Sequence, residues 1–235
     1  MTTTTVEADL VAANRILANE GFVDAFGHVT ARDPDDENRM IVSSYQSPAL
    51  VAEEDLIRMT LDGEILHDEV QDVYSETVIH RAIYRNRPDV NAVVHGHPDE
   101  LIPFCVTDVE IEPLTHQAAV FHDGVPTFED YDAERGIMVV TEAEGDRMAE
   151  SLGDCRAQLL KQHGANVVGA SVREAAVSAI YLMQNARRQI TAMSIGTPDY
   201  VSDDEGLVDA TVEGTILKPR TIDRAWDFLE HRLVD

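Results

Sequence analysis

The chain is short of basic residues, and of lysine above all. Lysine occurs only as Lys161 and Lys218, and 18 lysine and arginine residues together face 44 acidic ones, a formal net charge of −26. Such a charge repels phosphate groups, which argues against nucleic acid or an anionic membrane as a partner. A lysine-poor acidic surface is typical of proteins adapted to high salt, where ions screen the self-repulsion. We therefore expect the protein to be adapted to high salt. The alternative is an ordinary acidic cytoplasmic protein.

Cysteines and long apolar runs are also scarce. Cys105 and Cys155 belong to no motif, so we interpret both as small buried residues rather than as a disulfide or a nucleophile. No run approaches the roughly 18–20 apolar residues that a membrane-spanning helix needs. No basic and apolar signal segment opens the chain. The sequence therefore predicts a cytoplasmic protein that spans no membrane.

Helical and strand patterns mix along the whole chain, without an internal repeat or a linker. A length of 235 residues suits one large domain or two small ones, and 44% hydrophobic residues allow an ordinary core. We expect one layered domain of the α/β or α+β class over residues 1–235, with its core at about 6–196. The first helix is expected at Val6–Glu20, where apolar residues follow a helical stripe.

Capping patterns predict where the later helices begin. Thr141–Glu144 and Ser171–Glu174 both read as capping boxes, the second opening the longest helix. Residues 197–220 are acidic and are expected to be irregular. A last helix is expected over about 221–233, with Thr221 as its cap.

Two histidines form the most informative stretch. His95 and His97 follow the apolar residues Val93 and Val94 and are two positions apart. In a strand, side chains two apart point to the same face, so both imidazoles lie side by side. Neutral imidazole is the commonest metal ligand in proteins, so the pair predicts half of a metal site. The alternative is two hydrogen-bonded histidines at a strand end.

Two further residues are candidates for the same site. His163 ends an apolar strand over Ala157–Leu160 and is followed by glycine, as in a side chain directed into a cleft. Glu76 lies in the first turn of a helix expected to run to about Asn86, with Ser75 as its cap. His80 follows Glu76 by four positions, and a structural contact between the two is expected.

Four segments resemble the class II aldolase/adducin family in identity, spacing and order. They are Ser75-Glu76 with His80, the stretch Arg-Pro-Asp-Val-Asn-Ala-Val-Val-His-Gly-His ending at His97, the stretch Leu-Leu-Lys-Gln-His-Gly-Ala around His163, and the capped helix that follows. The resemblance runs from about residue 6 to residue 196. Fuculose-phosphate aldolase and ribulose-phosphate epimerase belong to this family.

The resemblance implies a fold, an assembly and a cofactor. The fold is a single α/β/α three-layer domain with a largely antiparallel central sheet, in a cyclic homotetramer with active sites between neighbouring subunits. His95, His97 and His163 match the ligands of one divalent metal ion per subunit, usually zinc and in some members manganese or another ion. Glu76 matches the acid that ligates the resting metal or acts as the acid–base group. The adducin branch has lost the histidines and catalysis, so their presence favours an enzyme.

The chemistry of these residues agrees with a carbon–carbon lyase. A divalent ion held by three neutral imidazoles keeps its positive charge and an open coordination position. When a bond beside a carbonyl breaks, the ion stabilises the enolate where charge develops. Glu76 would move a proton to or from the carbon or the leaving oxygen.

Departures from the family pattern concern the substrate. Sugar-phosphate aldolases cradle phosphate with a Gly-Asn turn, a glycine-containing loop and two serines before the glutamate. The matching places here contain bulkier side chains, which argues against a phosphorylated substrate. We expect contacts with the substrate from Ser44, Tyr74 and Ser75; the matching stretches read Gly27-His28, Ser44-Tyr45-Gln46-Ser47 and Tyr74-Ser75.

The Gly-His-Val-(Ser/Thr)-x-Arg form is similar to the decarboxylases of the family, which act on hydroxylated aromatic or heteroaromatic carboxylates. The similarity implies that His28 faces the substrate, that Arg32 forks its carboxylate, and that His116 is a second catalytic residue. The alternatives are a surface ion pair for Arg32 and a buried hydrogen-bonded imidazole for His116. The leading hypothesis is thus decarboxylation of a small hydroxyaryl carboxylate. Retro-aldol cleavage of a fuculose-phosphate-like sugar, 4-epimerisation of a sugar phosphate and a non-enzymatic adducin-like module are the alternatives.

Overall fold

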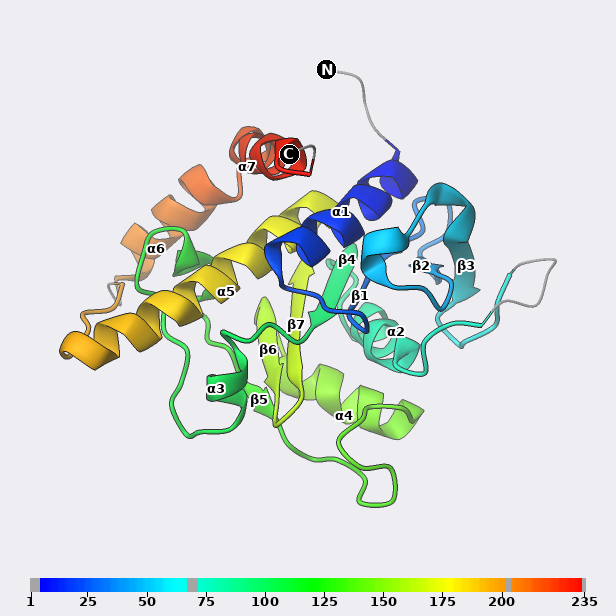
Figure 1. The fold of residues 1–235 in the computed structure, drawn as a ribbon, viewed down its shortest axis with the longest axis horizontal. Helices are drawn as coiled ribbons and strands as arrows, with labels where there is room; N and C mark the ends of the chain where they lie inside the picture. Colours follow the sequence, from blue (N-terminus) through cyan, green and yellow to red (C-terminus); the bar gives the residue numbers. More distant parts are fainter. Residues whose placement is uncertain (1–4, 67–71, 202–203, 234–235) are drawn as a thin grey trace.

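The structure is a computed structural model that describes residues 5–66, 72–201 and 204–233. The predicted bounds of 1–235 therefore include residues outside this description. A seven-stranded sheet forms the centre (Figure 1), and every neighbouring pair is antiparallel except β5 and β6. In spatial order the strands are β3 (Leu56–Thr60), β2 (Arg39–Ser43), β1 (His28–Arg32), β4 (Ala92–Gly96), β7 (Gly164–Gly169), β6 (Ala157–Leu160) and β5 (Thr127–Phe128).

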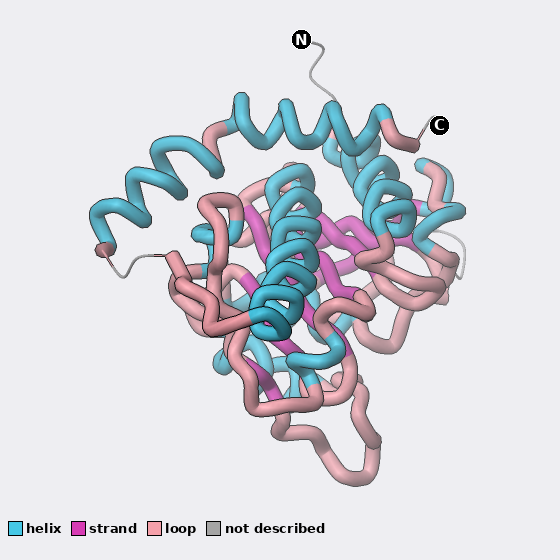
Figure 2. The backbone as a smooth tube through the Cα atoms, turned by 60° about the vertical axis from the view of Figure 1, so that its left-hand side comes forward, coloured by secondary structure: helices cyan, strands magenta, loops and turns pink. Residues whose placement is uncertain are grey.

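Helices cover both faces of this sheet, as Figures 1 and 2 show. One face packs against α1 (Val6–Glu20) and α5 (Val172–Ile195), which crosses the strands in Figure 2. The other face packs against α2 (Thr77–Asn86) and α4 (Glu142–Leu152). The predicted α/β/α layering with a largely antiparallel sheet is confirmed.

Strand β4 shows how the layers position the histidines. Ala92 and Val94 belong to the core beneath α1 and α5, whereas Val93 belongs to the core beneath α2 and α4. Because side chains alternate along a strand, His95 emerges on the same side as Val93. The predicted metal-binding imidazole is therefore directed toward α2.

The segment predicted to be irregular over residues 197–220 is largely helical, so that prediction was wrong. Helix α6 (Glu205–Thr211) continues into a π-helical turn at Val212–Ile216. Val208, Val212 and Ile216 lie four residues apart and are all buried in the core beneath α1 and α5. In the sequence, the glycines and acidic residues between these three positions weaken the pattern that would predict a helix. Asp204 caps α6, because its side chain accepts a hydrogen bond from the Leu207 amide at 3.0 Å.

Two predicted helix starts and one of the two predicted capping boxes also differ. The Thr141–Glu144 capping box forms as expected. Glu174, in contrast, accepts from the amide of Ala170 rather than from that of its cap residue Ser171. Helix α2 has Glu76, not Ser75, at its cap position, with no side-chain cap. Helix α7 (Pro219–His231) starts two residues before Thr221, because proline suits the first helical turn.

The remaining helical segments are short. They are α3 (Ile102–Cys105) and three 3₁₀ turns at Pro48–Leu50, Glu53–Asp55 and Ala118–Phe121. Among the described residues, no helix combines the length and the apolar content that crossing a bilayer would require.

Candidate metal centre

A cavity of about 370 Å³ opens beside the ends of β1 and β4 and the start of α2. Its walls combine histidines and one carboxylate with aromatic and small apolar side chains. The described lining residues are Ala25, Phe26, His28, Tyr45, Gln46, Ser47, Tyr74, Ser75, Glu76, His97, Met138 and His163.

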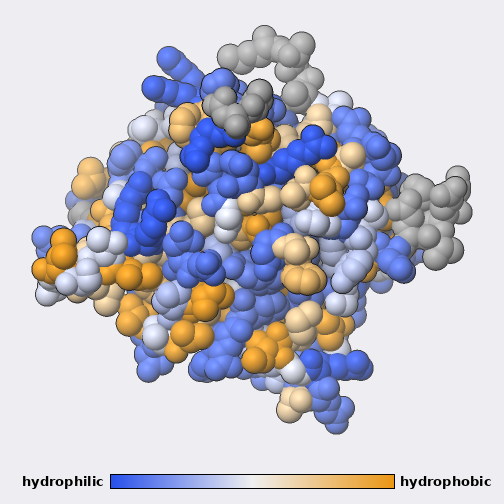
Figure 3. All heavy atoms as spheres, in the orientation of Figure 1, coloured by the Kyte–Doolittle hydropathy of each residue, from blue (hydrophilic) through white to orange (hydrophobic). Residues whose placement is uncertain are grey.

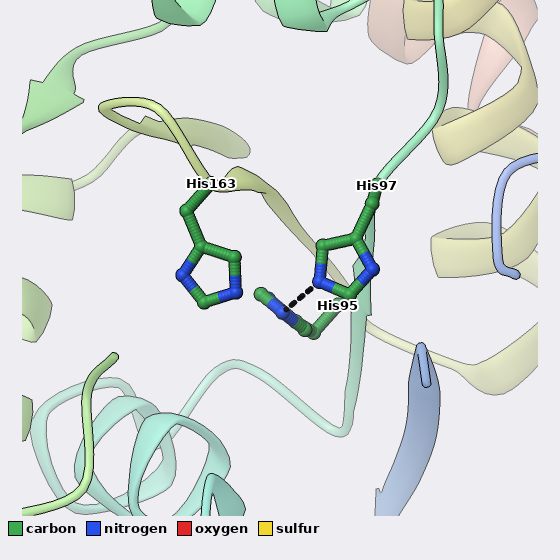
Figure 4. A group of neighbouring side chains, drawn as sticks. All are labelled: His95, His97 and His163. Carbon is green, nitrogen blue, oxygen red and sulfur yellow. Dashed lines mark hydrogen bonds between the residues drawn. The ribbon is translucent and has the colours of Figure 1, made fainter. Parts of the chain in front are cut away.

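The three histidines predicted as ligands converge, as Figure 4 shows. His95 ends β4, His97 follows it, and His163 lies in the turn between β6 and β7. The Nε2 atoms of His95 and His97 are 3.1 Å apart. The ring of His163 lies 5.1 Å from each of the other two rings, measured between centroids.

Two glycines permit this convergence. A Cβ atom on Gly96 would lie 2.4 Å from the carbonyl oxygen of Phe22. A Cβ atom on Gly164 would lie 2.4 Å from the carbonyl oxygen of Gly96 and 2.8 Å from Cδ2 of His97. The glycines of His-Gly-His and His-Gly are therefore needed because the chains approach too closely for any side chain.

Hydrogen bonds orient two of the ligands. Asn166 Oδ1 accepts from His95 Nδ1 at 2.8 Å, while the amide nitrogen of Asn166 lies 3.4 Å from Gln158 Oε1. Asp24 Oδ1 lies 3.3 Å from His97 Nδ1, and a carboxylate can only accept. Both rings thus carry their proton on Nδ1, so that a lone pair on each Nε2 faces the centre.

Burial keeps two of these imidazoles, those of His95 and His163, neutral. It lowers the pKa of His95 to about 3, helped by the neighbouring His97. Burial likewise lowers the pKa of His163 to about 4, with the charge of His95 adding to the effect. At neutral pH the rings are therefore unprotonated ligands, the form in which imidazole binds metal.

Glu76 completes the cluster from the start of α2. Its carboxylate oxygens lie 4.0 Å from His95 Nε2 and 3.7 Å from His163 Nε2. Burial raises the pKa of Glu76, while His163 acts in the opposite direction. Glu76 Oε1 and His163 Nδ1 are buried and have no hydrogen-bond partner among the described residues.

This arrangement fits a divalent cation. Two imidazole lone pairs facing each other at 3.1 Å repel unless a proton or a cation lies between them, and Asn166 and Asp24 hold the protons elsewhere. Nitrogens that share one tetrahedral zinc lie roughly 3.3 Å apart, close to the observed separation. The unpartnered Glu76 oxygen is explained by the same ion.

The structure also tests the other predicted site residues. His28, Tyr74 and Ser75 line the cavity with Glu76, whereas Ser44 does not, although the next three residues of its loop do. The amide of Ser44 instead donates to the carbonyl of Asp55 at 2.8 Å.

Arg32 and His116 are not brought to this cavity. The Arg32 guanidinium donates to four main-chain carbonyls, those of Glu37, Tyr84, Arg87 and Val90, at 2.7–3.0 Å. Its role as a carboxylate fork and the alternative of a surface ion pair are both wrong, because its donors are used within the fold. His116 is exposed on the segment before Ala118–Phe121, so the alternative of a buried imidazole is also wrong.

His80 differs from its prediction as well. It contacts His28 and Thr30 rather than Glu76. The reason is that Glu76 is the cap residue, outside the first helical turn, so the spacing of a regular helix does not apply between them.

Asn166, Asp24 and the apolar cavity wall were missed by sequence reasoning. Asn166 pairs with His95 across β4 and β7, and this register is a long-range property. Its signal was a lone polar residue within the buried stretch Gly164–Gly169. Phe26, Tyr45 and Met138 come from three separate loops, and no local pattern connects them.

Comparisons with known proteins agree with this geometry. Residues 8–190 match the family model described as Class II Aldolase and Adducin N-terminal domain. The 3,4-dihydroxyphthalate decarboxylase of Arthrobacter keyseri is 29% identical over 80% of this chain and 78% of its own. Decarboxylase tropJ of Talaromyces stipitatus is 25% identical over 92% of this chain and 89% of its own. The solved L-fuculose 1-phosphate aldolase from Glaciozyma antarctica PI12 superposes with a TM-score of 0.78 at 26% identity, covering 98% and 93% of the two chains.

Proposed function

The chain belongs to the class II aldolase and adducin family, and from that premise we propose that it is a divalent-metal-dependent lyase that decarboxylates a hydroxyaryl carboxylate. The observation that supports this most strongly is the convergence of three histidine rings, two of which line a cavity with Glu76 and aromatic side chains. Relatives named as decarboxylases and an aldolase of the same fold support lyase chemistry in general.

Each residue of the site has a separate role in the proposed reaction. His95, His97 and His163 would hold the ion, with zinc the first expectation and manganese the alternative, and Glu76 lies against the same position. When bound, the ion supplies positive charge beside the substrate oxygen that receives electrons from the breaking bond. Glu76, whose pKa burial raises, holds the proton that the ring carbon takes up as carbon dioxide leaves. Solvent then restores that proton.

The cavity wall favours an aromatic acid over a sugar phosphate. None of its described lining residues is a lysine or an arginine, the side chains that most often bind phosphate. Phe26, Tyr45 and Tyr74 instead offer flat apolar faces, and the Tyr74 and His28 rings stack at 4.7 Å. The name of one relative, 3,4-dihydroxyphthalate decarboxylase, describes a substrate of this class.

His116 is assigned to a neighbouring subunit's cavity in this proposal. It is exposed and does not line the cavity of its own chain, and the homotetramer implied by the family would bring it to another. Exposed Ile190, Met193 and Ile195 on the last turns of α5 offer an apolar surface for assembly. The face drawn in Figure 3 is mainly hydrophilic, with scattered hydrophobic patches. Mixing inactive His116→Ala with inactive His163→Ala chains should restore partial activity, and no recovery in demonstrated hybrids would contradict this role.

A substrate panel tests the reaction. The zinc- or manganese-loaded protein is offered 3,4-dihydroxyphthalate, 2-hydroxybenzoate, fuculose 1-phosphate and ribulose 5-phosphate, with carbon dioxide and aldehyde both measured. We expect carbon dioxide from an aryl acid, abolished in His95→Ala and retained in His231→Ala, a matched loss of an exposed imidazole. Aldehyde without carbon dioxide would establish the aldolase instead. A metal-loaded protein inactive on the whole panel would contradict the proposal.

A further inference from the structure

Behind the cavity, four side chains form a buried hydrogen-bonded chain. His28 Nδ1 lies 2.6 Å from His80 Nε2, and His80 Nδ1 lies 2.7 Å from Thr30 Oγ1. Thr30 Oγ1 in turn lies 2.9 Å from the hydroxyl of Tyr84. The chain thus runs from the cavity wall through β1 into the core beneath α2.

All four groups are shielded from water. None exposes more than 1% of its surface. The hydrogen-bond partners of each ring therefore determine which of its nitrogens carries a proton.

Tyr84 determines the direction of the chain. Its phenol has one proton to donate. Among the described residues, the backbone N–H of Val93 can only donate to this hydroxyl, so Thr30 Oγ1 is the acceptor within reach. A buried hydroxyl proton without an acceptor costs about 1–3 kcal/mol, so Tyr84 donates to Thr30. Thr30 must then donate to His80 Nδ1. His80 keeps its proton on Nε2 and donates it to His28 Nδ1.

We propose that this chain fixes His28 with its proton on Nε2, as a neutral hydrogen-bond donor to an anionic oxygen of the substrate. His28 Nε2 is buried, has no partner among the described residues, and belongs to a ring that lines the cavity. The ring is held flat between Tyr74 and His95, at 4.7 and 4.8 Å between centroids. Thr30 and His80 are positioning residues that act through it.

The assignment separates His28 from the ligands. His28, Glu76 and His95 are close enough to hold an ion between them, but a protonated Nε2 has no lone pair to give. His28 instead prefers a charged acceptor, because hydrogen bonds to ionised groups are the stronger ones. With the proposed function as its basis, this acceptor is the carboxylate or phenolate oxygen of the hydroxyaryl acid.

Nitrogen NMR of the zinc-loaded full chain, labelled with ¹⁵N in its histidines, tests the tautomer directly. Signals of His28 are assigned by their absence in His28→Gln. We expect a protonated, pyrrole-type Nε2 and a bare, pyridine-type Nδ1. A pyridine-type Nε2 in the wild-type protein would overturn the proposal, whatever the substrate proves to be.

Variants at the far end of the chain test its direction. Thr30→Val removes the donor to His80 and should leave His28 in two tautomers, whereas Thr30→Ser should keep one. Tyr84→Phe removes the phenol proton that fixes the direction, so Thr30 can then either donate to His80 Nδ1 or accept from it, and His28 should again populate two tautomers. It therefore serves as a second variant that tests the direction by losing a buried hydroxyl from the same core.

Binding of 2-hydroxybenzoate to the zinc-loaded protein gives the functional readout. We expect Thr30→Val to weaken it roughly tenfold and Thr30→Ser to stay within about twofold of wild type. Wild-type binding by Thr30→Val would overturn the positioning role. A protein with the expected tautomer that binds no 2-hydroxybenzoate would instead overturn the assigned acceptor, and with it the proposed substrate class.

Discussion

Replacing Asn166 by leucine should weaken zinc binding without disturbing the fold. Asn166 Oδ1 accepts the Nδ1 proton of His95 at 2.8 Å, and both side chains are buried. Leucine has a similar volume and no acceptor. In the variant, His95 can move its proton to Nε2 and donate it to His97 Nε2, 3.1 Å away. That tautomer has no lone pair for the ion.

The size of the effect follows from the hydrogen bond that zinc binding would leave unmade. A buried N–H without an acceptor costs about 1–3 kcal/mol, and 1.4 kcal/mol is about tenfold in affinity. We expect zinc affinity to fall roughly 10–100-fold, the range typical for partners of metal-binding histidines. Asn166→Asp keeps an acceptor and should retain most of the affinity, even though a buried carboxylate lowers stability.

Competition against a chromophoric chelator, at constant pH and salt, measures the affinity. Circular dichroism checks the fold. Asn14→Leu is the matched control, because Asn14 is an equally buried amide whose hydrogen bond is to the carbonyl of Leu10. Affinity within about twofold of wild type in a natively folded Asn166→Leu protein would refute the idea that Asn166 orients His95.

Three further predictions concern catalysis, the fold and the surface charge. Glu76→Gln should keep the fold and zinc binding within tenfold but lower turnover by about 10²–10⁴-fold, and near-normal turnover would remove its role as proton carrier. Arg32→Met should lower the free energy of unfolding by about 2–4 kcal/mol, because four main-chain carbonyls lose their hydrogen-bond donor. The KM of the folded fraction should not change. A raised KM at an unchanged melting temperature would instead show that Arg32 contacts the substrate. The melting temperature should rise between dilute and molar KCl, because salt screens a net charge of −26, and indifference to salt would argue against halophilic adaptation.

Short local patterns indicated which histidines would lie together, while their role as metal ligands stays a prediction. His95 and His97 share a face through strand alternation, and His163 precedes a glycine at the end of an apolar strand. Family resemblance then joined the two stretches, and the structure places them within one cluster. Helix α6 and the π-helical turn after it were missed for a related reason: their three buried positions are four residues apart, but glycines and acidic residues between them weaken the helical signal.

Arg32 was wrongly predicted because its partners are not local. The four carbonyls that it binds belong to the loop after β1, to the last turn of α2 and to the segment between α2 and β4. Every residue has a main-chain carbonyl, so no sequence pattern shows which of these carbonyls needs a hydrogen bond from a side chain. From sequence alone, an arginine beside a binding segment is therefore predicted to bind an anion, and only the backbone structure shows that carbonyls use its donors.

The partners of each ring decide what a buried histidine can do here. Asn166 and Asp24 accept hydrogen bonds from the Nδ1–H groups of His95 and His97, so these rings direct lone pairs inward and suit a cation. His80 donates to the outer nitrogen of His28, so that ring directs a proton inward and suits an anion. With an ion bound by the first pair, a positive charge and a hydrogen-bond donor would lie on adjoining walls of one cavity. An oxygen-rich anion can contact both at once, whereas a second cation would meet only repulsion.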